Sequence, residues 1–122
     1  MPTIGIVEDD QAISQMYRIK FEIEGYKVET AENGILGLEM IEKVRPDIIL
    51  TDLMMPDMNG DEMMVKLRKT PFGKDLKIIV LTNIGEQEMP EVLKTLGILD
   101  IIIKASMTPR QVFELVKKHL AI

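Results

Sequence analysis

The sequence predicts an α/β fold, a doubly wound (βα)5 arrangement in which five parallel strands are covered by helices on both faces. Short runs rich in β-branched residues alternate five times with segments of helical periodicity. Most of these runs are almost continuously apolar, which is typical of strands buried on both faces of a parallel sheet. Right-handed crossovers, together with two more polar runs that are expected at the edges, favour the strand order 2-1-3-4-5.

The expected strands differ in how deeply they should be buried. The second alternates polar and apolar residues and the fifth contains Asp100, so both are expected at the edges of the sheet. The other three consist mainly of isoleucine, valine and leucine, as central strands do. The strands are predicted at residues 3–7, 27–31, 47–52, 77–82 and 98–103.

Each strand is followed by apolar residues at helical spacing. Gly25 ends the first helix, and Pro46 prevents continuation of the second. Pro90 is tolerated only in the first turn of the fourth helix. Thr108-Pro109-Arg110-Gln111 is a capping box with proline at the first helical position, which predicts where the last helix begins. The helices are predicted at about residues 11–24, 33–44, 60–69, 89–96 and 109–120.

Helical spacing also predicts which side chains face the core. The residues expected to point inward are Ile13, Met16, Tyr17 and Ile23 from the first helix, Met89, Val92, Leu93 and Leu96 from the fourth, and Val112, Phe113, Val116 and Leu120 from the last.

Length and composition indicate a single domain, expected to span residues 1–122 and to lie in the cytoplasm. The chain has 46% hydrophobic and 29% charged residues, as ordinary globular domains do. It has no cysteine, which excludes disulfides, thiolate catalysis and cysteine-ligated metal sites. A net charge of −5 argues against direct nucleic-acid binding, and no apolar run is long enough to span a membrane.

Polar side chains that carry chemistry follow four of the expected strands. Glu8-Asp9-Asp10, Asp52, Thr82 and Lys104 each come directly after a β-branched run. Because the carboxyl ends of parallel strands open into one crevice, where ligands bind, we expect these groups to gather at one end of the sheet. Carboxylates, a hydroxyl and an ammonium together suit a divalent cation and a phosphoryl group.

The acidic residues predict a metal site. Asp9 and Asp52 end the first and third strands, which flank the point where the strand order reverses, so they should face each other. With Glu8 nearby, each close pair of carboxylates would repel by roughly 4 kcal/mol at an effective dielectric constant near 20. Oxygen-only ligands point to Mg²⁺ or Mn²⁺. The alternative is that the acids only cap the first helix, a role we expect for Asp10.

These residues match a known family. The chain resembles response-regulator receiver domains of two-component signalling, such as single-domain chemotaxis receivers, over essentially its whole length. No single motif is decisive, but the ordered set at strand ends is highly specific. The matching motifs are residues 7–10 (Val-Glu-Asp-Asp), 52–60 (Asp-Leu-Met-Met-Pro-Asp-Met-Asn-Gly), 81–82 (Leu-Thr) and 103–104 (Ile-Lys).

The resemblance implies a flavodoxin-like receiver fold and a phosphorylation switch. Asp52 would accept a phosphoryl group from a phosphohistidine on a sensor histidine kinase or a histidine phosphotransfer protein. Thr82 and Lys104 would contact the phosphoryl oxygens. Pro56 and Gly60 would shape the loop after Asp52. The ligands of Mg²⁺ or Mn²⁺ would be Glu8, Asp9, Asp52 and the backbone carbonyl of Met54.

The resemblance also implies how the signal would leave the domain. Phosphorylation would shift the face formed by the fourth helix, the fifth strand and the last helix toward binding an unknown downstream protein. The chain would act as a monomer or a weak phosphorylation-dependent dimer. It would not be an enzyme beyond catalysing its own phosphoryl transfer and dephosphorylation.

Three positions depart from the family pattern. Ala105 follows the lysine where many receivers have proline with a cis peptide bond, so a trans bond is expected here. Ile101 replaces an aromatic residue that often works as a rotating switch. Asn83 follows Thr82 where a small residue is common, and would slow access of water or donor. The phosphorylation chemistry should survive these changes, whereas transmission of the signal is expected to differ.

Other functions share parts of this pattern. A flavin-binding electron carrier of the same fold would need a phosphate loop rich in serine, threonine and glycine after the first strand, but residues 9–14 begin with two acids. A hydrolase with an aspartyl nucleophile would carry a second acid two residues after Asp52, but this chain has Met54 there, which argues against that function. The main alternative is a receiver-like scaffold that binds partners without being phosphorylated, and the intact set of strand-end residues argues against it.

Overall fold

The computed structural model describes residues 1–121, apart from the side chain of Glu86, and contains the expected five-stranded parallel sheet. Residue 122 of the expected domain lies outside the described residues. The strand order is β2-β1-β3-β4-β5, which confirms the prediction and places β2 and β5 at the edges. The strands are β1 (Thr3–Val7), β2 (Lys27–Ala31), β3 (Ile48–Thr51), β4 (Lys77–Thr82) and β5 (Asp100–Ile103).

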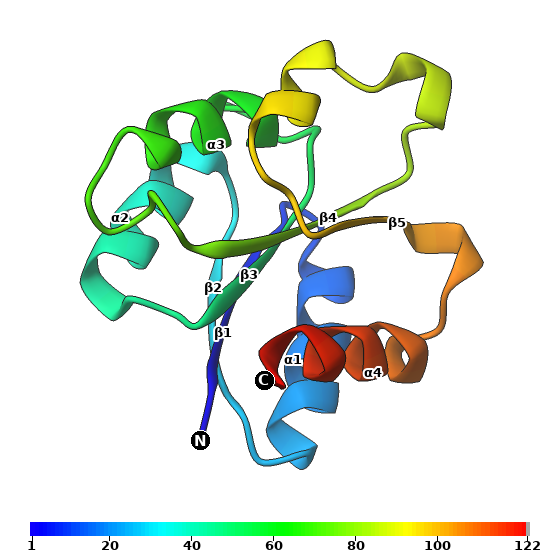
Figure 1. Ribbon diagram of the computed structural model, residues 1–122. Helices are drawn as coiled ribbons and strands as arrows, with labels where there is room; N and C mark the ends of the chain where they lie inside the picture. The colour runs from blue at the N-terminus through cyan, green and yellow to red at the C-terminus, as the bar shows by residue number, and fades with distance from the viewer. Residues whose placement is uncertain (122) are drawn as a thin grey trace.

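Four α-helices cover the sheet over residues 1–121, two on each face (Figure 1). One face carries the first and last helices, which lie side by side, and the other carries the middle two. The helices are α1 (Gln11–Ile23), α2 (Gly34–Val44), α3 (Gly60–Arg68) and α4 (Pro109–Leu120).

The two faces of the sheet build two apolar clusters. Alternate side chains of one strand go to opposite faces, so Ile4 and Ile6 pack under α1 and α4, whereas Val7 packs under α2 and α3. The central strands are buried along their length except for the first residues of β1 and β4, as their composition predicts. Burial of each large apolar side chain stabilises the fold by roughly 1.5–3 kcal/mol. This packing holds the strands, and with them the polar residues at the strand ends, in place.

The expected helix caps are present. The side chain of Asp10 accepts hydrogen bonds from the backbone N–H groups of Ala12 (3.0 Å) and Ile13 (3.1 Å), which confirms its capping role. The capping box of Thr108 and Gln111 begins α4. Every peptide bond within residues 1–121 is trans, including the one that precedes Ala105.

The inward face of α1 was partly mispredicted. Tyr17 is buried as expected, but Met16 is 41% exposed and Ile23 is 73% exposed. The helix instead packs through Ser14, Tyr17 and Phe21, which lie on one stripe. Apolar residues occur around most of this helix, so spacing alone gave the wrong rotation about its axis.

The fourth crossover differs from the prediction of an α-helix over residues 89–96. It consists of two short 3₁₀ stretches, Glu86–Glu88 and Glu91–Thr95, in the yellow-green and yellow part of Figure 1. Pro90 is extended, with φ −59° and ψ 136°, and therefore precedes the second stretch instead of joining its first turn. Gly97, with φ +66°, ends the segment, so too few residues remain for a stable α-helix.

A half-buried guanidinium holds the end of this crossover. Arg68 donates from Nε to the carbonyl of Leu96 (2.8 Å) and from Nη1 to the carbonyls of Gly73 (2.8 Å) and Leu76 (2.7 Å). Leu93 and Leu96 of this crossover are buried, as their spacing predicts. The side chain thus joins the crossover to the loop between α3 and β4.

Among residues 1–121, none of the helices combines the length and the apolar character needed to cross a membrane.

Candidate functional site

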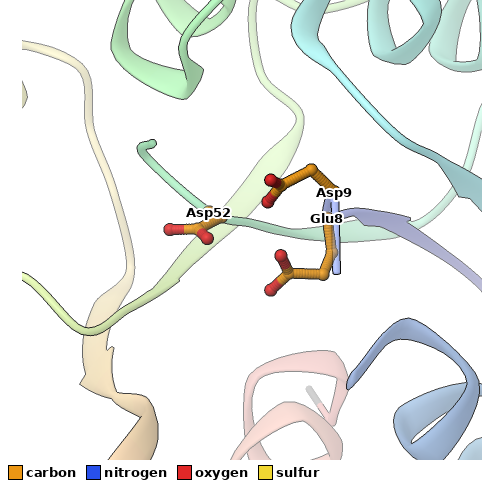
Figure 2. Close-up of side chains that lie close together, drawn as sticks. All are labelled: Glu8, Asp9 and Asp52. Carbon is orange, nitrogen blue, oxygen red and sulfur yellow. The ribbon is translucent and has the colours of Figure 1, made fainter. Parts of the chain in front are cut away.

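The acidic residues lie at the carboxyl ends of two neighbouring strands. Val7 of β1 is paired with Thr51 of β3, and the N–H of Asp52 donates to the carbonyl of Val7 at 3.0 Å. Glu8 and Asp9 therefore leave β1 beside the point where Asp52 leaves β3. Figure 2 shows the three carboxylates at this one edge of the sheet.

The carboxylates are close enough to share one ion. One oxygen each from Glu8, Asp9 and Asp52 lies within 4.8 Å of the others. Opposite ligands of an octahedral Mg²⁺ are about 4.2 Å apart, since each bond is about 2.1 Å long. The three carboxylate oxygens would therefore need to move only slightly closer together to bind one ion. Asp9 is exposed, whereas Glu8 and Asp52 are 3% and 8% exposed. The donor set thus fits a hard divalent cation with room for water.

Lys104 supplies a positive charge to the same site. It follows β5, and its Nζ lies 2.9 Å from Oδ2 of Asp52 and also donates to Oε1 of Glu8. The side chains of Lys104 and Asp52 are each about one-tenth exposed. The ammonium therefore bridges two of the three carboxylates and neutralises part of their repulsion.

Burial and charge act in opposite directions on this ion pair. Burial raises the pKa of the Glu8 carboxyl, and hydrogen bonds from Lys104 and from the N–H of Asp10 offset only part of that effect. Burial acts to lower the pKa of Lys104, but its hydrogen bonds to Glu8 and Asp52 and their charges outweigh it and raise that pKa. Lys104 is therefore a permanent cation at neutral pH.

The carboxylate of Asp52 is held in one orientation. Its Oδ1 accepts from the backbone N–H of Leu53 at 2.7 Å and from that of Met54 at 3.4 Å, whereas Oδ2 faces Lys104. The loop that follows β3 thus folds back on its own first residue. The amide of Met54 lies at the site, and its side chain is 59% exposed.

Thr82 lies at the same end of the sheet. It is fully buried and is paired with Ile103, the residue before Lys104. Its hydroxyl oxygen accepts from the N–H of Ile84 at 3.2 Å, so the hydroxyl proton is free to donate elsewhere. Within residues 1–121 it makes no hydrogen bond to Asp52. The structure thus gathers the acids and Lys104, and leaves Thr82 bonded to its own loop.

Further residues shape the loop after Asp52. A Cβ added at Gly60 would lie 1.9 Å from the carbonyl oxygen of Asp52, so only glycine fits there. Asn59 accepts from the N–H of Met55 at 3.0 Å and closes the loop. Asn33, from the start of α2, donates to Asp57 at 3.3 Å and was not expected at the site. The repeated Asn-Gly pair at 33–34 and 59–60 was the available signal.

Comparison by sequence finds one matching family model and relatives that are regulatory proteins. The model of a family described as response regulator receiver domain matches residues 4–117. The phosphate regulon transcriptional regulatory protein PhoB of Rhizobium meliloti is 36% identical over 110 residues, which are 89% of this chain and 48% of PhoB. The DNA-binding dual master transcriptional regulator RpaA of Synechocystis is 37% identical over 86 residues, 70% of this chain and 36% of RpaA. The chain thus spans less than half the length of these two curated relatives.

Comparison by structure gives a similar result over almost the whole chain. The chemotaxis response regulator CheY4 of Vibrio cholerae has a TM-score of 0.87 at 29% identity, over 97% of this chain and 98% of CheY4. A CheY-like response regulator receiver domain protein of Methanospirillum hungatei has a TM-score of 0.89 at 32% identity, over 98% and 94% of the two chains.

Proposed function

Because the chain belongs to the response regulator receiver domain family of two-component signalling, we propose that it is a phosphorylation switch whose acceptor is Asp52. The observation that carries the proposal is the position of the Asp52 carboxylate, which lies beside the carboxylates of Glu8 and Asp9 and accepts from the ammonium of Lys104. Residues 1–122 would act as one receiver domain.

The proposed reaction is transfer of a phosphoryl group from a phosphohistidine. The Asp52 carboxylate attacks phosphorus while the bond from phosphorus to the histidine nitrogen breaks, which leaves an acyl phosphate on Asp52 and the electron pair on the imidazole. The donor would be a sensor histidine kinase or a histidine phosphotransfer protein. The N–H groups of Leu53 and Met54 orient the nucleophile before the donor arrives.

Glu8, Asp9, Asp52 and the backbone carbonyl of Met54 are the proposed ligands of Mg²⁺ or Mn²⁺. When bound, the cation would supply charge neutralisation at the transferring phosphoryl oxygens. Once Asp52 carries the acyl phosphate, Lys104 would move from the Asp52 carboxylate to a phosphoryl oxygen. Thr82 would donate its free hydroxyl proton to another of these oxygens.

The proposed output follows from the movement of Thr82 and Lys104. Thr82 ends β4, before the fourth crossover, and Lys104 directly follows β5, before α4. Their shift toward the phosphoryl group would therefore pull on that face. Ile101 on β5 is 40% exposed and belongs to it. Since the fourth crossover is 3₁₀ and extended, the face consists of residues 86–99, β5 and α4. A downstream protein would bind there, and the chain would be a monomer or a weak phosphorylation-dependent dimer.

Labelling with acetyl phosphate tests this function and separates it from an unphosphorylated scaffold. With Mg²⁺ and radiolabelled acetyl phosphate, we expect close to one phosphoryl group per chain. A chelator should abolish the label, and excess Mn²⁺ should restore it. A protein that remains unlabelled with both metals, and also with a phosphorylated histidine phosphotransfer protein, would be the scaffold.

Removing the Lys104 charge should tighten cation binding while slowing phosphorylation. In Lys104→Met the Glu8 and Asp52 carboxylates lose their counter-charge. We expect the Kd for Mg²⁺, measured by calorimetric titration, to fall by about tenfold, since a charge at this range is worth at least about 1.4 kcal/mol. Lys94→Met is the control, because Lys94 pairs with the exposed Glu91 and, among the described side chains, with no group of the site. An unchanged or weaker affinity in Lys104→Met would show that the ammonium does not compete with the cation.

A further inference from the structure

A tether joins the start of α2 to the loop that carries Met54. The side-chain amide of Asn33 donates from Nδ2 to Oδ2 of Asp57 at 3.3 Å. One residue on, the N–H of Gly34 donates to the carbonyl of Met58 at 3.0 Å. These two bonds connect the second crossover to the third, 24 residues further along the chain. They are not needed to build either helix.

Both polar atoms of the Asn33 side chain are used, one for the helix cap and one for the bond to Asp57. It is 8% exposed, and its two polar atoms have different tasks. Oδ1 accepts from the N–H of Leu36 at 2.9 Å and caps α2, whereas Nδ2 is left to bind Asp57. A serine or an aspartate caps a helix equally well, so capping does not explain why an amide stands here.

Asp57 adopts a backbone conformation that needs support. Its φ is +66°, in the left-handed region, which costs a residue with a side chain roughly 1–2 kcal/mol. Met58, the next residue, donates to the carbonyl of Pro56 at 2.7 Å. The chain therefore turns sharply at Asp57, and this turn determines how residues 53–56 return toward Asp52. The hydrogen bond from Asn33 holds that turn from outside the loop.

The geometry points to Asn33 as a positioning residue for the phosphorylation site. By holding Asp57, it fixes the loop conformation in which the amides of Leu53 and Met54 bind the Asp52 carboxylate. The carbonyl of Met54, the proposed cation ligand, belongs to the same loop. This inference rests on the proposed function for its effect on phosphorylation. Its effect on the loop itself is independent of that function.

Exchanging the side chains of residues 33 and 57 tests the tether, because the double variant keeps both the net charge of the protein and the cap of α2. Asn33→Asp keeps the cap of α2 but sets two carboxylates against each other. Asp57→Asn keeps the tether, because an amide oxygen still accepts from Asn33, and asparagine tolerates the left-handed region. The double variant restores the bond with donor and acceptor reversed and restores the net charge.

The expected pattern is that only Asn33→Asp is impaired. In metal-free protein, the NMR amide signals of Leu53 and Met54 should shift in Asn33→Asp and return in the double variant. The rate of labelling and the affinity for Mg²⁺ should fall by about tenfold in Asn33→Asp and recover with the exchange, as is typical of residues that orient metal ligands. An added negative charge by itself would strengthen Mg²⁺ binding, so the sign of the change separates loss of the tether from simple electrostatics.

Two results would overturn the assignment. One is an Asn33→Asp protein with unshifted Leu53 and Met54 signals and ordinary Mg²⁺ affinity. The other is a double variant that stays as impaired as Asn33→Asp. If the unaltered protein takes no label while the amide signals follow the expected pattern, the proposed function fails and the tether stands.

Discussion

Replacing Asp52 with asparagine is expected to lower phosphoryl uptake from acetyl phosphate by at least about 1,000-fold, the scale on which covalent mechanisms lose rate without their nucleophile. The amide keeps the size of the side chain and can still accept from the N–H of Leu53, so the loop should remain folded. It lacks the negative charge that attacks phosphorus and pairs with Lys104. Incorporated label per chain, with Mg²⁺ present, measures the effect.

Asp57→Asn is the matched control for this prediction. Asp57 is an exposed carboxylate on the same loop, and it lies outside the acidic cluster. The same chemical change there should leave the incorporated label unchanged. Stoichiometric label in Asp52→Asn, or its loss in Asp57→Asn, would move the acceptor away from Asp52.

Gly60→Ala is expected to cause the largest loss of stability among single changes near the site. The added Cβ would lie 1.9 Å from the carbonyl oxygen of Asp52 and about 3 Å from the backbone of Leu53. These are backbone atoms at the end of β3, so no side chain can turn away to make room. We expect the free energy of unfolding, measured by urea titration, to fall by about 3 kcal/mol, together with loss of phosphorylation.

Gly85→Ala provides the control for an added methyl group. No atom of the described, non-adjacent residues lies within 4 Å of a Cβ at Gly85, and its backbone is outside the left-handed region. Its unfolding free energy should stay the same or rise by about 0.4–1 kcal/mol through the entropy of the unfolded chain. If both variants unfold at the same urea concentration, the close approach of Gly60 to Asp52 does not constrain the loop.

The sheet and the gathering of the acidic residues were predictable from local patterns. Continuous apolar runs locate central strands, and the carboxyl ends of parallel strands meet at one edge whatever the details of the loops. The proximity of Asp9 and Asp52 follows from that rule, and the structure confirms it. Their roles, and those of Thr82 and Lys104, stay predictions until phosphorylation is measured.

The remaining features depend on contacts between distant segments. The fourth crossover has helical spacing, but Pro90 is extended and Arg68, from the end of α3, holds the segment by its last carbonyls. The rotation of α1 about its axis depends on which of its apolar stripes packs against the sheet and α4. The hydrogen bond between Asn33 and Asp57 joins two loops, and the hydrophobic periodicity of the sequence does not predict such a pair.

Chemical location of the phosphoryl group tests the central claim most directly. Borohydride reduces an aspartyl phosphate to homoserine, which mass spectrometry of peptides assigns to a single position. After incubation with acetyl phosphate and Mg²⁺, we predict homoserine at position 52 alone, and none when a chelator replaces the metal. Homoserine at position 9 or 57, or equal conversion without a divalent cation, would contradict an acceptor that works beside a bound metal ion.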